Sequence, residues 1–124
     1  LNNRISLYKK LIQSVDGAYD FVVSADTLHH INNPMDFWLT VKRISKKFFV
    51  MDLLRPDTIE QVKRIVRVLA KNHEEVYKQD FENSLCAAFT LEELEKQLAD
   101  TGISNYKIVV QGDVCKTFYL EGTV

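Results

Sequence analysis

Two apolar runs stand out in the first half of the chain. Residues 19–25 read YDFVVSA and residues 47–54 read KFFVMDLL. Runs this apolar, with little polar alternation, are typical of strands that are covered on both faces of a parallel sheet. The second run ends at Arg55-Pro56, because proline has no N–H to give to a strand ladder. The pattern predicts that residues 19–25 and 47–53 form adjacent parallel strands joined by a right-handed crossover.

A helix is predicted between these strands, over residues 34–45. Asn33 offers its side-chain oxygen as N-cap, and Pro34 takes the first helical position, where its missing N–H costs nothing. The apolar stripe of this helix consists of Phe37, Trp38, Val41 and Ile44. Basic residues gather at its C-terminal end, where positive charge complements the helix dipole, so we interpret them as structural rather than as an anion site. They are Lys42, Arg43, Lys46 and Lys47.

Two further helices are predicted after Pro56. Residues 57–60, DTIE, resemble a capping box with Asp57 as the cap, and an apolar stripe follows to about Lys71. The pattern over residues 74–89 is weaker. One helical face there could be lined by Val76, Phe81, Leu85 and Ala88.

The last third of the chain predicts a helix and a hairpin. TLEE at residues 90–93 is a second capping box, and Gly102 is well placed to end the helix in a left-handed conformation. Residues 106–111 and 116–121 then predict two antiparallel strands around Gly112-Asp113. Strand, helix, strand, helices and hairpin together define an α/β fold with a three-layer mixed sheet.

Composition limits the kind of protein this is. The chain has 124 residues, 46% of them apolar, so one domain covering residues 1–124 is expected. Sixteen basic and seventeen acidic residues give a charge of −1, which argues against nucleic acid or an anionic membrane surface as a partner. The apolar runs are far shorter than the ~20 residues of a membrane span. Without a signal-peptide layout, a cytoplasmic location is predicted, with Cys86 and Cys115 as buried free thiols.

Several motifs carry a family resemblance. YDFVVSADTLHHI at residues 19–31 resembles the fourth strand and following turn of class I S-adenosylmethionine-dependent methyltransferases, and NPMDFW at 33–38 is similar to their next helix start. FVMDLLRP at 49–56 resembles their fifth strand, and DFENSLCAAFT at 80–90 resembles a segment of one bacterial branch. The terminal hairpin matches their sixth and seventh strands in order. The resemblance covers residues 3–122 and implies a Rossmann-like methyltransferase fold.

One part of the family pattern has no counterpart here. Such enzymes begin with a strand and a G-x-G-x-G loop that holds the cofactor, followed by a strand ending in an acidic residue for the ribose. The four glycines of this chain are Gly17, Gly102, Gly112 and Gly122, and they form no such loop. Residues 4–9, with a strand-like pattern at 5–8, look like the third strand of the family. We therefore expect a truncated sheet, and a chain that lacks an upstream segment.

The resemblance implies a position for the cofactor. In the family the turn after the fourth strand lies beside it, which carries over to Ser24, Ala25, Asp26, Leu28 and His29. The carboxyl end of a parallel strand, where α/β sheets bind ligands, independently supports this stretch. Asp26 is the candidate catalytic residue, because it could take a proton from the nucleophile. Its alternative role is a cap for the next turn.

Candidate substrate-binding residues lie on two other segments. Asp52 and Arg55 end the second parallel strand, where Arg55 could hold a carboxylate or phosphate or instead form a surface ion pair. Asp80, Asn83 and Ser84 share a helical face by their spacing and could line the substrate pocket, although solvent exposure and capping explain them as well.

The His29-His30 pair invites a metal reading that we do not adopt. Adjacent histidines at a strand end point in different directions, and no third ligand stands at a useful spacing. No metal is predicted. One histidine is expected to pack, and His30 is assigned to the substrate pocket.

The expected function is that of the C-terminal portion of a methyltransferase acting on a small-molecule acceptor. Without the glycine loop, this chain alone is expected to be inactive and to bind S-adenosylmethionine weakly or not at all. An alternative is a non-catalytic remnant that acts as an interaction module. A dehydrogenase is disfavoured because no G-x-G-x-x-G occurs.

A partner is also expected from the truncation. Residues 19–25 would form an open, apolar sheet edge, and such edges invite pairing. Either residues 4–12 fold back over this edge, or two chains meet there as a homodimer, which we favour because Lys9 and Lys10 suit a solvated position.

Overall fold

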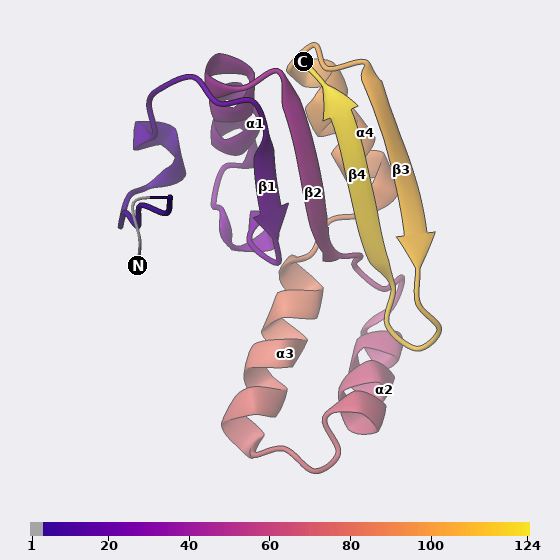
Figure 1. Cartoon of the computed structure of the whole chain (residues 1–124). Helices are drawn as coiled ribbons and strands as arrows, with labels where there is room; N and C mark the ends of the chain where they lie inside the picture. Colours follow the sequence, from indigo (N-terminus) through magenta and orange to yellow (C-terminus); the bar gives the residue numbers. More distant parts are fainter. Residues whose placement is uncertain (1–3) are drawn as a thin grey trace.

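The structure is a computed structural model that describes residues 4–124. The helices and strands follow the order expected from the sequence (Figure 1). They are η1 (Ile12–Ser14), β1 (Val22–Ala25), η2 (Leu28–His30), α1 (Pro34–Ile44), β2 (Lys47–Leu53), α2 (Ile59–Leu69), α3 (Glu75–Ala87), α4 (Leu91–Asp100), β3 (Asn105–Gln111) and β4 (Thr117–Thr123).

The four strands form one mixed sheet in the order β1-β2-β4-β3. β1 runs parallel to β2, with Val22 opposite Phe48, and a single parallel bridge from Tyr19 to Ser45 extends the pairing. β4 is antiparallel to both β2 and β3. The predicted parallel pair, the helix between its strands and the terminal hairpin are therefore confirmed.

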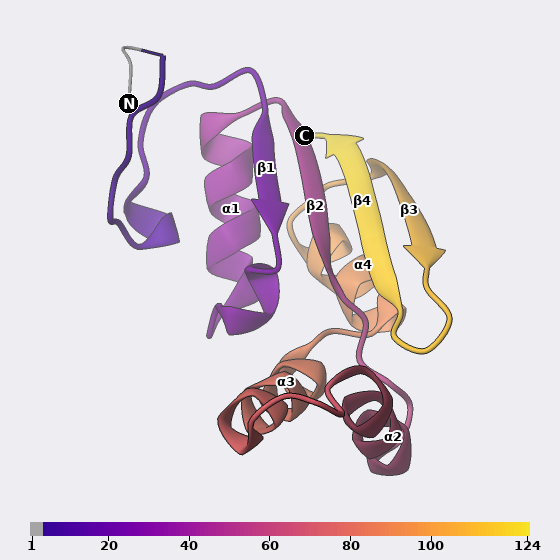
Figure 2. The same ribbon diagram turned by 60° about the horizontal axis from the view of Figure 1, so that its bottom comes forward.

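One face of the sheet carries the main core. Phe48 and Val50 of β2 and Phe118 and Leu120 of β4 are all fully buried on this face, because alternate residues of a strand point the same way. α1 and α4 lie side by side behind it (Figures 1 and 2). They add the apolar residues Phe37, Trp38, Val41, Leu94 and Leu98.

The helix ends are fixed as the sequence predicts. The Asn33 side chain accepts a hydrogen bond from the Met35 N–H at 3.1 Å, and Thr90 and Glu93 form the complete capping box of α4. Gly102 ends α4 with φ of +74°. These signals are local, so the sequence shows them directly.

No helix within residues 4–124 covers the opposite face of the sheet (Figure 2). Val23 is 66% exposed and Val109 37% exposed there. The described part of the chain therefore has two layers where three were predicted, and the sheet face that carries Val23 and Val109 is left open.

A helical lobe formed by α2 and α3 stands apart from the main core. Figure 1 shows it below the sheet, at the end where β1 and β2 finish. Its own small core consists of Val62, Ile65, Val66, Ala70 and Leu85, with Leu53 and Phe81 against it.

Two details of the lobe differ from the prediction. α2 is capped by Thr58, not Asp57: the Thr58 hydroxyl accepts from the Gln61 N–H, and the Gln61 side chain accepts from the Asp57 N–H. The capping residues are therefore Thr58 and Gln61, one position later than the predicted Asp57 and Glu60. Val76 is 72% exposed rather than on the inner face. It lies nine residues before Leu85, which is about 180° away around a helix of 100° per residue.

The expectations for the N-terminal segment and for the cysteines are also corrected. Residues 5–8 form no strand, and Leu7 is 75% exposed, because no neighbouring strand offers a hydrogen-bonding ladder. No strand forms along residues 5–11 to pair with the edge of β1. Ile12 packs against the main core and η1 contacts α1, so this segment folds back onto α1 and not over the edge, as the fold-back alternative required. Both cysteines are free, but Cys86 is exposed and Cys115 only partly buried.

Candidate functional site

The candidate site lies where the parallel strands end and the α2–α3 lobe begins. The chain enters the lobe after β2 and returns just before α4, and the two passages are held together. Leu54 and Phe89 form a parallel bridge, and the Arg55 N–H donates to the Phe89 carbonyl at 3.1 Å. α3 also contacts η2. The lobe therefore covers the carboxyl edge at which α/β sheets bind ligands.

The turn after β1 holds an unusual backbone conformation. Asp26 is the only non-glycine residue with positive φ in the described chain, at +50°. Its N–H donates to the Met51 carbonyl at 2.9 Å, and the Thr27 hydroxyl donates to the Ala25 carbonyl at 2.8 Å. The Asp26 and Ala25 side chains are exposed. Non-glycine residues take this conformation at a cost of about 1 kcal/mol or more, and such residues cluster at functional sites.

Asp52 and His29 form a buried hydrogen-bonded pair behind this turn. The Asp52 carboxylate lies 2.6 Å from His29 Nδ1 and accepts from the His29 backbone N–H at 2.9 Å and the Leu53 N–H at 2.7 Å. The two side chains are 1% and 4% exposed. Asp52 was predicted to bind a polar substrate, but its side chain is closed to solvent and its two oxygens are hydrogen-bonded to His29. A lone Asp within the apolar run FVMDLL was the signal for a buried partner.

Two buried polar atoms near the strand end have no hydrogen-bond partner among the described residues. They are His29 Nε2 and Ser24 Oγ. Ser24 lies on β1 opposite Val50, on the covered face of the sheet. Buried polar atoms are nearly always paired, so each such atom requires a ligand, a water or a cost in stability.

The remaining residues assigned to the cofactor or substrate lie in different environments. Leu28 is fully buried in the main core, so its side chain offers packing only. His29 is buried, so it packs as expected, and His30 is exposed. Their ring centroids lie only 3.9 Å apart, so the expectation that the two histidines point in different directions is wrong. On α3, Asp80 and Asn83 are exposed and Ser84 is half-buried, and Asn83 accepts from Gln79 at 3.0 Å.

Arg55 joins the lobe to α4. Its guanidinium donates to Glu93 at 2.6 Å and to the Ala88 carbonyl at 3.3 Å, so the predicted surface ion pair is confirmed. Burial raises the pKa of Glu93, but the hydrogen bond from the Thr90 N–H and the charge and hydrogen bond of Arg55 lower it further, to below the ordinary value.

Residues 4–124 contain no cluster of three or more His, Cys, Asp or Glu side chains able to hold a metal ion. No helix in this range is long and apolar enough to cross a membrane.

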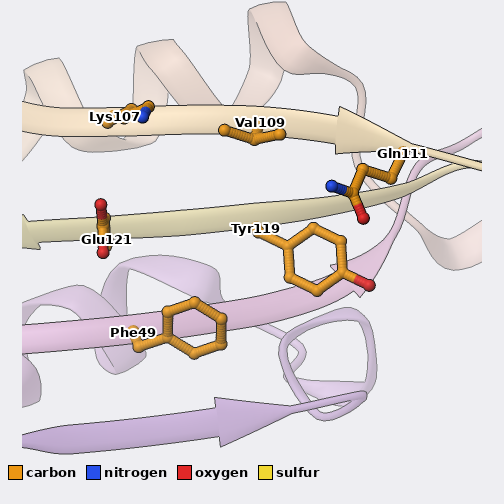
Figure 3. Close-up of a pocket in the computed structure, with 6 residues that line it drawn as sticks. All are labelled: Phe49, Lys107, Val109, Gln111, Tyr119 and Glu121. Carbon is orange, nitrogen blue, oxygen red and sulfur yellow. The ribbon is translucent and has the colours of Figure 1, made fainter.

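A shallow hollow lies elsewhere, on the uncovered face of the sheet. Figure 3 shows its lining side chains from β2, β3 and β4, with the helices behind the strands. They are Phe49, Lys107, Val109, Gln111, Tyr119 and Glu121. It shares no residue with the strand-end site.

Solved structures share this arrangement. The chain aligns with the crystal structure of the plantazolicin methyltransferase BamL, in complex with a triazolic desmethylPZN analog and SAH, with a TM-score of 0.62 and 10% identity over 90% of this chain and 56% of BamL. It aligns with a SAM-dependent methyltransferase from Aquifex aeolicus with a TM-score of 0.58 and 15% identity over 98% of this chain and 56% of that one. This is the fold of a class I SAM-dependent methyltransferase. The chain spans just over half the length of each. Neither a protein-family profile nor a curated protein matches its sequence.

The residues at the carboxyl edge of the sheet show how much of a SAM site this chain could form. The exposed turn at Ala25 and Asp26, with Ser24 Oγ and His29 Nε2 unsatisfied behind it, offers polar groups at the carboxyl edge. The glycines of the described chain lie elsewhere: Gly17 before β1, Gly102 after α4, and Gly112 and Gly122 in the hairpin. The residues therefore suit one side of a SAM site.

Proposed function

We propose that this chain forms the acceptor-side portion of a SAM-dependent methyltransferase that transfers a methyl group to a small molecule. The observation that carries the proposal is the exposed, left-handed turn at Asp26, next to two unsatisfied buried polar atoms, at the carboxyl edge of a methyltransferase-like sheet. The neighbour BamL was crystallised with SAH, which makes SAM the cofactor to test first.

Bound SAM supplies a methyl group on a positively charged sulfur. Methyl transfer needs alignment of the nucleophile with that methyl group and removal of at most one proton. Ser24, Ala25, Asp26, Leu28 and His29 would form the wall beside the cofactor, with the backbone of Leu28 rather than its buried side chain contributing. Asp26 would orient the acceptor or accept its proton. His30, Asp80, Asn83 and Ser84 would face the acceptor from η2 and α3. Arg55, which is paired with Glu93, would instead hold the lobe against α4.

Affinity for the cofactor should be low in this chain alone. The backbone of a glycine loop approaches a ligand closely because no Cβ stands in the way, and nothing in residues 4–124 replaces it. Titration calorimetry with SAH should therefore show binding weaker than ~1 μM, which corresponds to about −8 kcal/mol. A dissociation constant at or below that value would contradict the claim that this chain forms only one side of a SAM site.

A second candidate function is an interaction module, and the uncovered sheet face favours it. Phe21 is 50% and Val23 66% exposed at the outer strand, and no strand among residues 4–124 pairs with the free edge of β1. An open edge of this kind supports pairing with a second copy of the chain about a two-fold axis. We place the contact of such a homodimer at residues 19–25.

Light scattering distinguishes the homodimer from the single chain. A dimer would give twice the 14.4 kDa of one chain at micromolar concentration, and Val23→Lys should restore the single-chain mass. Val23 is chosen over its neighbour Val22 because Val22 packs partly against the core, where a lysine would also destabilise the fold. Leu39→Lys is the matched control, since Leu39 is 54% exposed on α1, away from the edge. A mass of 14.4 kDa for the parent chain would exclude the dimer.

A further inference from the structure

The buried His29–Asp52 pair has the geometry of a held imidazole with one free nitrogen. Nδ1 lies 2.6 Å from Asp52 Oδ1, while the other carboxylate oxygen accepts from the His29 backbone N–H. Two attachments to one carboxylate fix both the ring and the main chain of η2. Because a carboxylate accepts only, the Nδ1 position must carry the hydrogen.

The tautomer decides what the other nitrogen can do. In a neutral ring with hydrogen on Nδ1, Nε2 carries a lone pair and accepts a hydrogen bond. Nε2 has no hydrogen-bond partner among the described residues. It is also shielded from water, because the His29 side chain is only 4% exposed. It lies on η2, the element that α3 of the lobe contacts, at the carboxyl edge of β1. A hydrogen-bond donor from outside the chain would satisfy it.

We propose that Asp52 is a positioning residue that holds His29 so that Nε2 receives the proton of the methyl acceptor. This deepens and rests on the proposed function. The acceptor oxygen forms a bond to the methyl carbon, the bond from that carbon to the sulfonium sulfur breaks with its electrons staying on sulfur, and the hydroxyl proton passes to Nε2. The positive charge thus moves from sulfur to the imidazolium, which the Asp52 carboxylate stabilises.

The same geometry selects the chemical class of the acceptor. A carboxylate has no hydrogen to donate and would leave Nε2 unsatisfied. A protonated amine would bring a second positive charge next to the sulfonium. A neutral hydroxyl, such as a phenol, donates one hydrogen and exposes an oxygen lone pair, so it fits both demands. Asp26, exposed on the turn, then orients the acceptor and is not its base.

The first test is the tautomer of His29 in the full chain, read from nitrogen-15 NMR of its ring. His29→Gln assigns the resonance. The parent should carry hydrogen on Nδ1 and none on Nε2, and Asp52→Asn should shift the balance toward hydrogen on Nε2. Asp113→Asn, in the exposed hairpin turn, is the matched control and should change nothing. Hydrogen on Nε2 in the parent would overturn the proposal even if Asp52→Asn does not fold.

The second test asks whether Nε2 meets a ligand hydroxyl. Phenol and toluene have nearly the same shape, but only phenol donates a hydrogen bond. Phenol should shift the Nε2 resonance of the parent saturably, several-fold more than toluene at equal concentration. Equal responses, or no response to phenol, would overturn the acceptor role. Neither test uses SAH, so SAH binding and this proposal can fail independently.

Discussion

Replacing Asp52 by Asn should lower the stability of the fold substantially. The carboxylate is 1% exposed and faces three N–H donors, at 2.6, 2.7 and 2.9 Å. Asparagine keeps one accepting oxygen but turns an amide NH2 toward at least one of those donors. The loss is one to two charge-assisted hydrogen bonds at roughly 1.5–3 kcal/mol each, so we expect about 3 kcal/mol.

Urea unfolding measures this directly. With a denaturant slope of about 2 kcal/mol/M, a loss of about 3 kcal/mol moves the midpoint down by roughly 1.5 M. Asp113→Asn provides the control, because Asp113 is exposed in the hairpin turn. A midpoint change for Asp52→Asn no larger than that of the control would refute the claim that Asp52 holds this end of the sheet.

Three further outcomes are expected. Gly122→Ala should destabilise the hairpin by about 1–3 kcal/mol in urea, because a Cβ there would lie 2.6 Å from a backbone oxygen of β3. The pKa of Glu93 is lowered in the fold, so its pairing with Arg55 stabilises above the ordinary value of 4.5 and is lost as pH falls through the lower folded value. Thermal melts from pH 6 to ~3 should show a shallower acid loss in Glu93→Gln than in the parent chain. A thiol reagent should label exposed Cys86 much faster than Cys115, whose pKa burial raises, and equal rates would contradict this.

The elements that the sequence revealed are those set by local chemistry. The apolar runs of β1 and β2, the Asn33 cap and the TLEE capping box each require only neighbours within a few residues, and all are present. Misassignments arose where two local signals overlap, as at Asp57 and Thr58. They also arose where a strand needs a partner, as at residues 5–8.

The site was less accessible to sequence reasoning. The turn after β1 was expected from its place at a strand end, and its role in binding stays a prediction. The pairing of Asp52 with His29 joins residues 23 positions apart on different elements. Only the register of β1 against β2 brings them together. The contacts of Arg55 depend in the same way on the return of the chain at Phe89, which no local pattern predicts.

The central claim is that one side of a SAM site lies at the turn after β1. It is tested most directly by titrating SAH into the nitrogen-15-labelled chain and following backbone amide shifts, because this detects binding as weak as ~1 mM, or about −4 kcal/mol. We predict weak, saturable shifts concentrated at residues 24–30, with none in the hollow lined by Phe49, Val109 and Tyr119. Shifts confined to that hollow, or no shifts at all at millimolar SAH, would contradict the claim.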